Sequence, residues 1–285
     1  MDDSQFDATR HHYTVLQRFY EKMFGTTSIH FPLWLPGTET IDQAVTNAER
    51  LMADAAGIEP GMRVLDAGCG LGHSAFWLAE NRQAQVLGIN IVPSNVERAR
   101  EIAGERGLSD RVGFEVVNYM SDPFEDESFD VIWNLESFAY ARPKEDYLAW
   151  VHRVLKPGGR WVCIDGFIDR DKCRGSLDRH SVSVAAKGFG YPDMQFRGTG
   201  NVLALVRRAG LVDGRFDDLT AHLGDRTRTV ARIGTLKSVL FLKDYFKNRP
   251  KYFERISAFR ATDHSTRLFQ RGVGSYGLMV ARKPG

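Results

Sequence analysis

The sequence predicts an α/β fold: a doubly wound, mostly parallel sheet with extra helices before it and a helical cap. Two observations carry this prediction. Short apolar strand patterns alternate with helical patterns from residue 63 to residue 165, as in sheets built from strand–helix–strand units. The stretch VLDAGCGLGH, residues 64–73, places three glycines directly after the first strand pattern, where such sheets bind ligands.

The individual elements follow from hydrophobic spacing and turn residues. Apolar residues at helical spacing predict helices, and a Lys-Pro-Gly-Gly run predicts a turn at residues 156–159. The expected strands cover residues 63–66, 85–89, 112–117, 129–134, 160–165, 215–219 and 276–281. The expected helices cover residues 9–25, 40–56, 72–80, 94–106 and 147–154.

The chain divides into two predicted regions. Residues 1–55 form an N-terminal helical extension or lid, and residues 56–285 form the main domain. Two segments interrupt the alternation in the main domain and are interpreted as cap insertions. The segment at about 167–200 is charged and glycine-rich, and the segment at about 226–270 is basic and largely helical.

Composition excludes several classes of function. The net charge of +2 is too small to indicate nucleic-acid binding by itself. The three cysteines lack a Cys-x-x-Cys spacing, which indicates reduced thiols and no metal site. The polar N-terminus does not resemble a signal peptide, and no apolar run approaches the roughly 20 residues of a membrane span. We therefore expect a cytoplasmic protein that acts on a small molecule, without a nucleic-acid partner or a membrane span.

The glycine-rich stretch favours a ligand with a cationic group. Gly68, Gly70 and Gly72 follow Asp66, whose acid would repel a phosphate but suits an ammonium group. His73 stands where a dinucleotide fingerprint requires its third glycine, and no phosphate-binding loop motif is present.

VLDAGCGLG resembles the first motif of the class I S-adenosylmethionine-dependent methyltransferases. The strand FDVIWNLES and the turn LKPGGRW are similar to later motifs of that family, so the resemblance covers roughly residues 55–166. It implies a Rossmann-like seven-stranded sheet, S-adenosylmethionine as cofactor and S-adenosylhomocysteine as product. On the family's pattern, the backbone of residues 68–72 packs against the methionine part and Asp66 holds its amino group.

The second strand ends at Asn90, where most of the family has an acid that binds both ribose hydroxyls. A neutral residue there resembles the branch of sterol, tocopherol and terpenoid C-methyltransferases and the related cyclopropane synthases. Residues 118–120 resemble the segment that lines the adenine, although Tyr119 alone could equally be plain packing. The cofactor-binding residues implied by the resemblance are Asp66, Gly68, Gly70, Gly72, Asn90, Ile91, Asn118, Tyr119, Met120 and Asn134.

The Asn-x-Glu-Ser pattern at residues 134–137 resembles geranyl diphosphate C-methyltransferase and its sterol relatives, in which the matching glutamate faces the acceptor. Methylation of an alkene leaves a carbocation, which needs aromatic faces around it and a carboxylate to remove a proton. Glu136 is the predicted base, and Tyr20 and Tyr191 are further catalytic candidates. The predicted acceptor-pocket residues are His30, Phe31, Trp34, Phe138, Tyr140 and Phe167.

Plainer interpretations stay open beside these. Glu136 could be an acid at a helix N-terminus, stabilised by the helix dipole, and each aromatic residue could belong to the core. The cations of the segment 167–200 would suit a diphosphate, and Mg²⁺ is expected only with such an acceptor. They could equally be a solvated surface.

The sequence is therefore consistent with three functions. The first is C-methylation of a prenyl or terpenoid-derived metabolite through a carbocation, which some relatives couple to ring closure. The second is N- or O-methylation of a small natural product, and the third is binding of S-adenosylmethionine without transfer. The aromatic N-terminal helix could also pack against a second copy of the chain, giving a homo-oligomer.

Overall fold

A computed structural model describes residues 6–7, 9–14, 28–121, 124–190, 197–224 and 249–285. Its centre is a sheet of seven strands in the order β3-β2-β1-β4-β5-β7-β6. The strands are β1 (Arg63–Ala67), β2 (Gln85–Asn90), β3 (Val112–Val116), β4 (Phe129–Leu135), β5 (Leu155–Ile168), β6 (Val212–Asp218) and β7 (Gly274–Arg282). The pairs from β3 to β5 are parallel, whereas β7 runs antiparallel to both β5 and β6.

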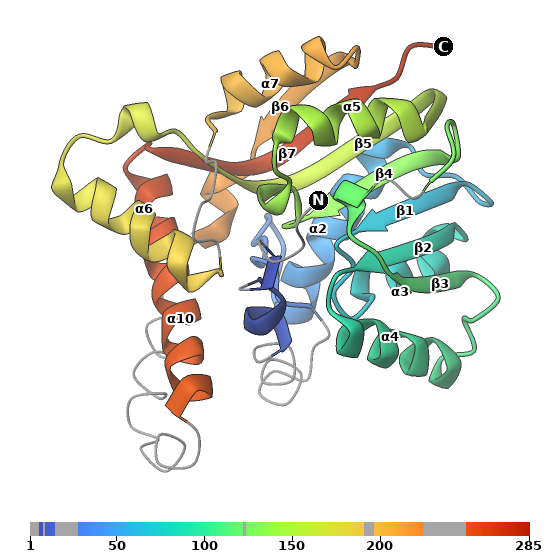
Figure 1. Cartoon of the computed structure of the whole chain (residues 1–285), viewed down its shortest axis with the longest axis horizontal. Coiled ribbons are helices and arrows are strands. Elements are labelled where there is room, and N and C mark those ends of the chain that lie inside the picture. The colour runs from blue at the N-terminus through green and yellow to red at the C-terminus, as the bar shows by residue number, and fades with distance from the viewer. Residues whose placement is uncertain (1–5, 8, 15–27, 122–123, 191–196, 225–248) are drawn as a thin grey trace.

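Helices cover both faces of this sheet (Figure 1). α2 (Ile41–Ala56), α3 (His73–Arg82) and α4 (Pro93–Glu105) contribute to one hydrophobic core, and α5 (Lys144–Val154) and α7 (Thr199–Arg208) contribute to the other. β1 supplies both cores, because successive side chains of a strand point to opposite faces: Val64 lies in the first core and Leu65 in the second. Burial on both sides explains why the central strands are almost continuously apolar.

The predicted α/β fold and all seven predicted strands are confirmed. The turn expected at residues 156–159 lies within β5 instead, which begins at Leu155. Phe129 pairs with Leu155 and Val131 pairs with Arg160, so four residues of β5 face a single residue of β4. The Lys-Pro-Gly-Gly run therefore forms a bulge inside a longer strand.

The helical predictions are confirmed where the structure describes the chain. Thr40 caps α2, and its side chain accepts a hydrogen bond from the backbone N–H of Gln43 in a capping box. Of the helix expected at residues 9–25, only residues 9–14 are described, and these are helical. None of the described helices combines the length and apolar character that a membrane crossing requires.

The two cap segments contain helices that pack against each other. α6 (Ser176–Gly188) comes from the first segment, and α10 (Arg249–Gln270) comes from the second. They lie side by side and project from the end of the sheet at the left of Figure 1. Gly188 makes this contact close, because a Cβ there would lie 2.4 Å from the carbonyl oxygen of Ser257 on α10.

The strand order reverses between β1 and β4, which both lie at the centre of the sheet. In open α/β sheets this is the place where ligands bind, at the carboxyl ends of the strands. Asp66 lies at that end of β1, and Glu136 directly follows β4. The topology therefore brings the two predicted acidic site residues to the same edge of the sheet.

Candidate active site

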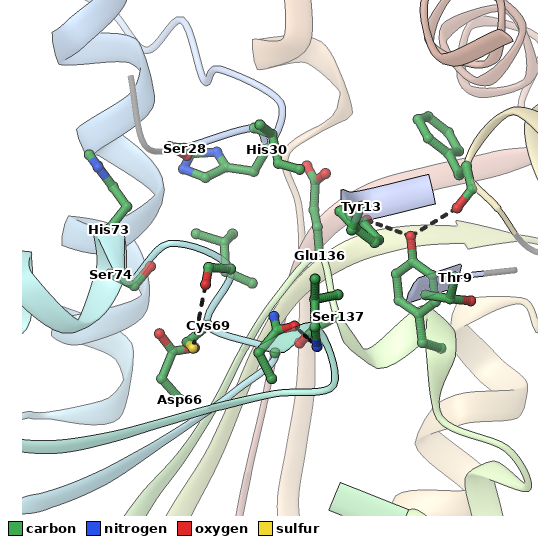
Figure 2. A pocket seen from close by; sticks show the side chains of 18 of the residues that line it. Thr9, Tyr13, Ser28, His30, Asp66, Cys69, His73, Ser74, Glu136 and Ser137 are labelled. Carbon is green, nitrogen blue, oxygen red and sulfur yellow. Dashed lines mark hydrogen bonds between the residues drawn. The ribbon is translucent and has the colours of Figure 1, made fainter. Parts of the chain in front are cut away.

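A cavity of about 270 Å³ opens at the carboxyl ends of β1, β2 and β4. Its wall also includes four N-terminal residues, most of the segment 28–34 and three residues of α10; the N-terminal residues are Phe6, Thr9, His12 and Tyr13. In the view of Figure 2, Asp66 and Cys69 lie on one side of this pocket and Tyr13 on the other, with Glu136 between them. Segments that are far apart in the sequence therefore share one binding site.

The loop after β1 needs its glycines for close approach of neighbouring groups. Gly68 has a φ of +102°, and a Cβ there would lie 2.4 Å from the Cβ of Ser137. Gly68 and Gly70 line the cavity as predicted. Gly72 does not line it: a Cβ at this position would lie 2.6 Å from the ring of Phe114, so this glycine is required by packing beneath the loop.

Asp66 carries an unpaired carboxylate oxygen into the cavity wall. The side chain is 3% exposed, and its Oδ2 has no hydrogen-bond partner among the described residues. Burial, together with the charge of Glu49, raises the pKa of Asp66 to about 8. An ammonium group placed there would supply the missing donor and the compensating charge. These residues therefore fit the amino group of S-adenosylmethionine.

The ends of β2 and β3 supply polar groups to the same cavity. Asn90 lines it with its neighbour Ile91, and its Oδ1 accepts a hydrogen bond of 2.9 Å from the backbone N–H of Val92. Its amide N–H groups remain available as donors to a hydroxyl. Asn118 and Tyr119 also line the cavity, as expected of the adenine segment.

Asn134 lies beneath the site, and its side chain does not line the cavity. It is fully buried, donates to the carbonyl of Ala67 and to Ser137 Oγ, and accepts from Tyr147 and Trp161. All four bonds are between 2.7 and 3.1 Å long. The structure thus gives Asn134 a supporting role, because its hydrogen bonds tie the end of β4 to the end of β1.

Three other predicted site residues lie in the core on the α5 and α7 side of the sheet: Met120, Phe138 and Phe167. The ring centroid of Phe138 lies 5.2 Å from that of Trp161. The ring centroid of Phe167 lies 5.4 Å from that of Phe216. None of the three lines the cavity, since strand alternation and the short helix after β4 turn their side chains toward this core.

The other predicted pocket residues do lie in the cavity wall: His30, Phe31, Trp34 and Tyr140. The hydroxyl of Tyr140 donates to the carbonyl of Phe189 and lies 2.5 Å from the hydroxyl of Tyr13. Tyr13 thereby connects the N-terminal helix to the wall of the site within the same chain. The catalytic candidates Tyr20 and Tyr191 lie outside the described residues.

Glu136 is held firmly in the wall of the cavity. Its Oε1 accepts hydrogen bonds of 2.7 Å from the backbone N–H of Phe31 and from the hydroxyl of Tyr276. The described residues donate no hydrogen bond to its Oε2. Because the carboxylate binds these groups of other elements, it does not cap the short helix that follows. The burial of Glu136 raises its pKa to about 7, although the charge of His30 opposes this effect.

A buried group on α2 was not anticipated from the sequence. Glu49 is fully buried, lies 3.3 Å from His30 Nε2 and 3.7 Å from His73 Nε2, and accepts a hydrogen bond from Ser74. Burial opposes protonation of His30, but the charge and hydrogen bond of Glu49 outweigh it and raise the pKa of His30 to about 9. The sequence feature that could have indicated this role is the position of Glu49, an acid on the apolar face of an amphipathic helix.

The cations of the first cap segment do not line the cavity. Lys172 lies 3.8 Å from Asp169, and Arg197 lies 3.6 Å from Glu145. The described residues that line the cavity include no lysine or arginine. Nor does the described part of the chain contain a group of three or more His, Cys, Asp or Glu side chains placed to hold a metal ion.

Comparisons with known proteins agree with this geometry. Residues 58–180 match the family described as a methyltransferase domain. Methyltransferase GfsG of Streptomyces halstedii is 34% identical over 65% of this chain and 66% of its own length. A sterol 24-C-methyltransferase of Yarrowia lipolytica is 34% identical over 66% of this chain and 49% of its own length. The alignments thus span about half to two thirds of these relatives.

Solved structures show the same fold across nearly the whole chain. The cyclopropane synthase MmaA2 of Mycobacterium tuberculosis superposes with a TM-score of 0.82 at 16% identity, covering 98% of both chains. Geranyl diphosphate C-methyltransferase of Streptomyces coelicolor A3(2) gives 0.72 at 19% identity, covering 98% of this chain and 97% of that one.

The reversed strand order, the glycine loop and the buried acid at the end of β1 define a methyltransferase domain of class I. The chain belongs to the S-adenosylmethionine-dependent methyltransferases, and the relatives that it matches include sterol 24-C-methyltransferases.

Proposed function

We propose that this protein methylates a carbon atom of a small apolar acceptor derived from a prenyl or terpenoid unit, with Glu136 as the base. The observation that carries the proposal is the position of Glu136: a carboxylate in a cavity wall that also contains aromatic side chains, held through one oxygen only. The sterol and geranyl diphosphate methyltransferases among the similar proteins support it by the names of their acceptors.

S-adenosylmethionine, when bound, supplies an electrophilic methyl group. The chain's own residues would place it: Asp66 would hold the amino group, the backbone of Gly68 and Gly70 would lie against the methionine part, and Asn90 would donate to a ribose hydroxyl. Transfer from this cofactor depends mainly on in-line placement of the acceptor. The wall opposite Asp66, which includes Glu136 and Tyr13, is where the acceptor would lie.

Glu136 is suited to remove a proton after methylation. An alkene that accepts a methyl cation becomes a carbocation, which regains neutrality by losing a proton from a neighbouring carbon. A base works best when its pKa lies near the working pH, and the pKa of Glu136 is about 7. The bonds from Phe31 and Tyr276 fix Oε1, so Oε2 would accept the proton.

The aromatic side chains around the cavity would stabilise the cation before it loses the proton. Phe31, Trp34, Tyr13 and Tyr140 all contribute to the wall, and ring faces attract a positive charge. The same wall would serve if the cation closes a ring before deprotonation. Mg²⁺ enters this scheme only for an acceptor that carries a diphosphate.

Incubation with ¹³C-methyl-labelled S-adenosylmethionine and a panel of acceptors tests the proposal. The panel contains prenyl alcohols, prenyl diphosphates, prenylated aromatics, simple amines and phenols. We expect one labelled methyl on an alkene carbon, located by NMR of the product. Label found only on nitrogen or oxygen would favour the second function, and S-adenosylmethionine binding without turnover of any acceptor would favour the third.

A further inference from the structure

A second, smaller cavity continues from the main one beyond Glu136. Its volume is about 50 Å³, and four of its lining residues also line the main cavity: Tyr13, Phe31, Glu136 and Phe189. The additional residues come from the end of β5, the start of β7 and α10. The small cavity is therefore a side chamber of the acceptor site, with Glu136 at the junction.

Asp165 forms the acidic part of this chamber. It is 6% exposed, and its carboxylate oxygens accept one hydrogen bond each, of 2.8 Å from the backbone N–H of Ala139 and of 2.7 Å from that of Gly166. The backbone N–H of Phe138 also stabilises this carboxylate, which leaves it capacity for one further donor. Lys144 is a buried cation whose charge acts on Asp165, but it directs its Nζ to the carbonyls of residues 138, 139 and 141.

Ser265 of α10 adds an unpartnered hydroxyl. The residue is 3% exposed and lines the chamber, and it makes no side-chain hydrogen bond with the described residues. A hydroxyl that borders a cavity and has no partner in the protein can donate a hydrogen bond to a ligand or accept one from it. The hydroxyl of Tyr276 also borders the chamber and, while donating to Glu136, can still accept a hydrogen bond.

These groups define the chemistry of the ligand that fits. Two carboxylates, Glu136 and Asp165, disfavour an anion and favour a group that donates hydrogen bonds. The chamber exceeds the ~10–15 Å³ that one water molecule needs, so a hydroxyl with its carbon atom fits. We propose that this chamber binds a hydroxyl group of the acceptor, with Asp165 accepting its hydrogen bond and Ser265 as a second partner.

This inference rests on the proposed function and adds to it a feature of the acceptor. The apolar body of the acceptor would occupy the main cavity, while its hydroxyl lies on the far side of Glu136. The reactive carbon would then be held at a fixed distance from the base. A diphosphate in place of the hydroxyl would meet two buried carboxylates and be rejected.

Calorimetric titration tests the inference without requiring turnover. The protein, saturated with S-adenosylhomocysteine, is titrated with three probes that share one prenyl body: geraniol, geranyl diphosphate and the hydrocarbon myrcene. We expect geraniol to bind about tenfold more tightly than myrcene and more tightly than geranyl diphosphate. Ser265→Ala should reduce the affinity for geraniol about 3- to 10-fold, the effect of one neutral hydrogen bond, and leave myrcene unchanged.

Ser257→Ala is the matched control, because Ser257 lies on the same helix and does not line either cavity. Equal affinities for geraniol and myrcene, or tighter binding of the diphosphate, would overturn the inference and leave the proposed function standing. If none of the three probes binds, the prenyl acceptor itself is contradicted, and the inference falls with it.

Discussion

The proposed cofactor half and the proposed acceptor half of the site are built in different ways. The cofactor half consists mainly of residues at the carboxyl ends of β1 and β2 and after β3, such as Asp66, Asn90 and Asn118. The acceptor half combines the segment 28–34, the residue after β4, and side chains of β7 and α10. The cofactor half is thus set by local sequence motifs, whereas the acceptor half is assembled from segments that are far apart in the sequence.

This difference predicts that the two halves can be disabled separately. Glu136→Gln keeps the size of the side chain and an oxygen for Phe31 and Tyr276, but it removes the base. We expect product formation to fall by about 10²- to 10⁴-fold, the usual contribution of a general base. The affinity for S-adenosylhomocysteine, measured by calorimetry, should be unchanged. A parallel loss of product formation and of affinity for S-adenosylhomocysteine would contradict the prediction that the two halves can be disabled separately.

The reverse change acts on the cofactor half. Asp66→Asn removes the charge that would pair with the cofactor's ammonium group, so we expect binding of S-adenosylhomocysteine to weaken by about 10- to 100-fold. Asp110→Asn, at an exposed position, is the control and should bind normally. Unchanged cofactor affinity in Asp66→Asn would exclude the assigned role of Asp66.

Glu49 connects the two halves, because it lies against His30 on the acceptor side and Ser74 on the cofactor side. Glu49→Gln would leave the charged His30 buried without its partner, which typically costs about 3–5 kcal/mol. We expect a lower free energy of unfolding in urea and a fall in the pKa of His30, followed by NMR of its ring protons. An unchanged pKa of His30 would show that Glu49 does not set its charge.

A further prediction concerns the pH dependence of stability. The pKa of Asp66 is raised from 3.8 to about 8 in the folded protein, so the unfolded chain loses this proton at lower pH than the folded one. The protein without ligand should therefore lose stability as the pH rises from about 4 to 8. Asp66→Asn should flatten this dependence in thermal unfolding. An identical pH profile in the variant would show that Asp66 is not protonated in the fold.

The sequence predicts the cofactor half of the site better than the acceptor half. The seven strands and the residues Asp66, Gly68 and Asn90 were predictable because strand patterns and the turns after them are local features. Tyr276 and Glu49 were not, since their contacts to the site arise from packing of elements far apart in the chain. Asn134 belongs to a recognisable motif, but the motif does not reveal that its side chain points into the core.

The sequence also does not show which aromatic residues line the cavity. Composition and spacing nominate many of them, but only the packed structure separates Phe31 and Tyr140, which line the cavity, from Phe138 and Phe167, which lie in the core. Hydrophobic periodicity identifies a buried side chain without stating which neighbour buries it.

The central claim is that Glu136 removes the proton from a methylated carbocation. Product analysis by gas chromatography and mass spectrometry of the Glu136→Gln variant, with an acceptor that the wild-type protein converts, tests it most directly. Without the base the cation should be captured by water or rearrange, so we predict that methylated alcohols or rearranged products replace the wild-type alkene. The same alkene, formed at the wild-type rate, would contradict the account.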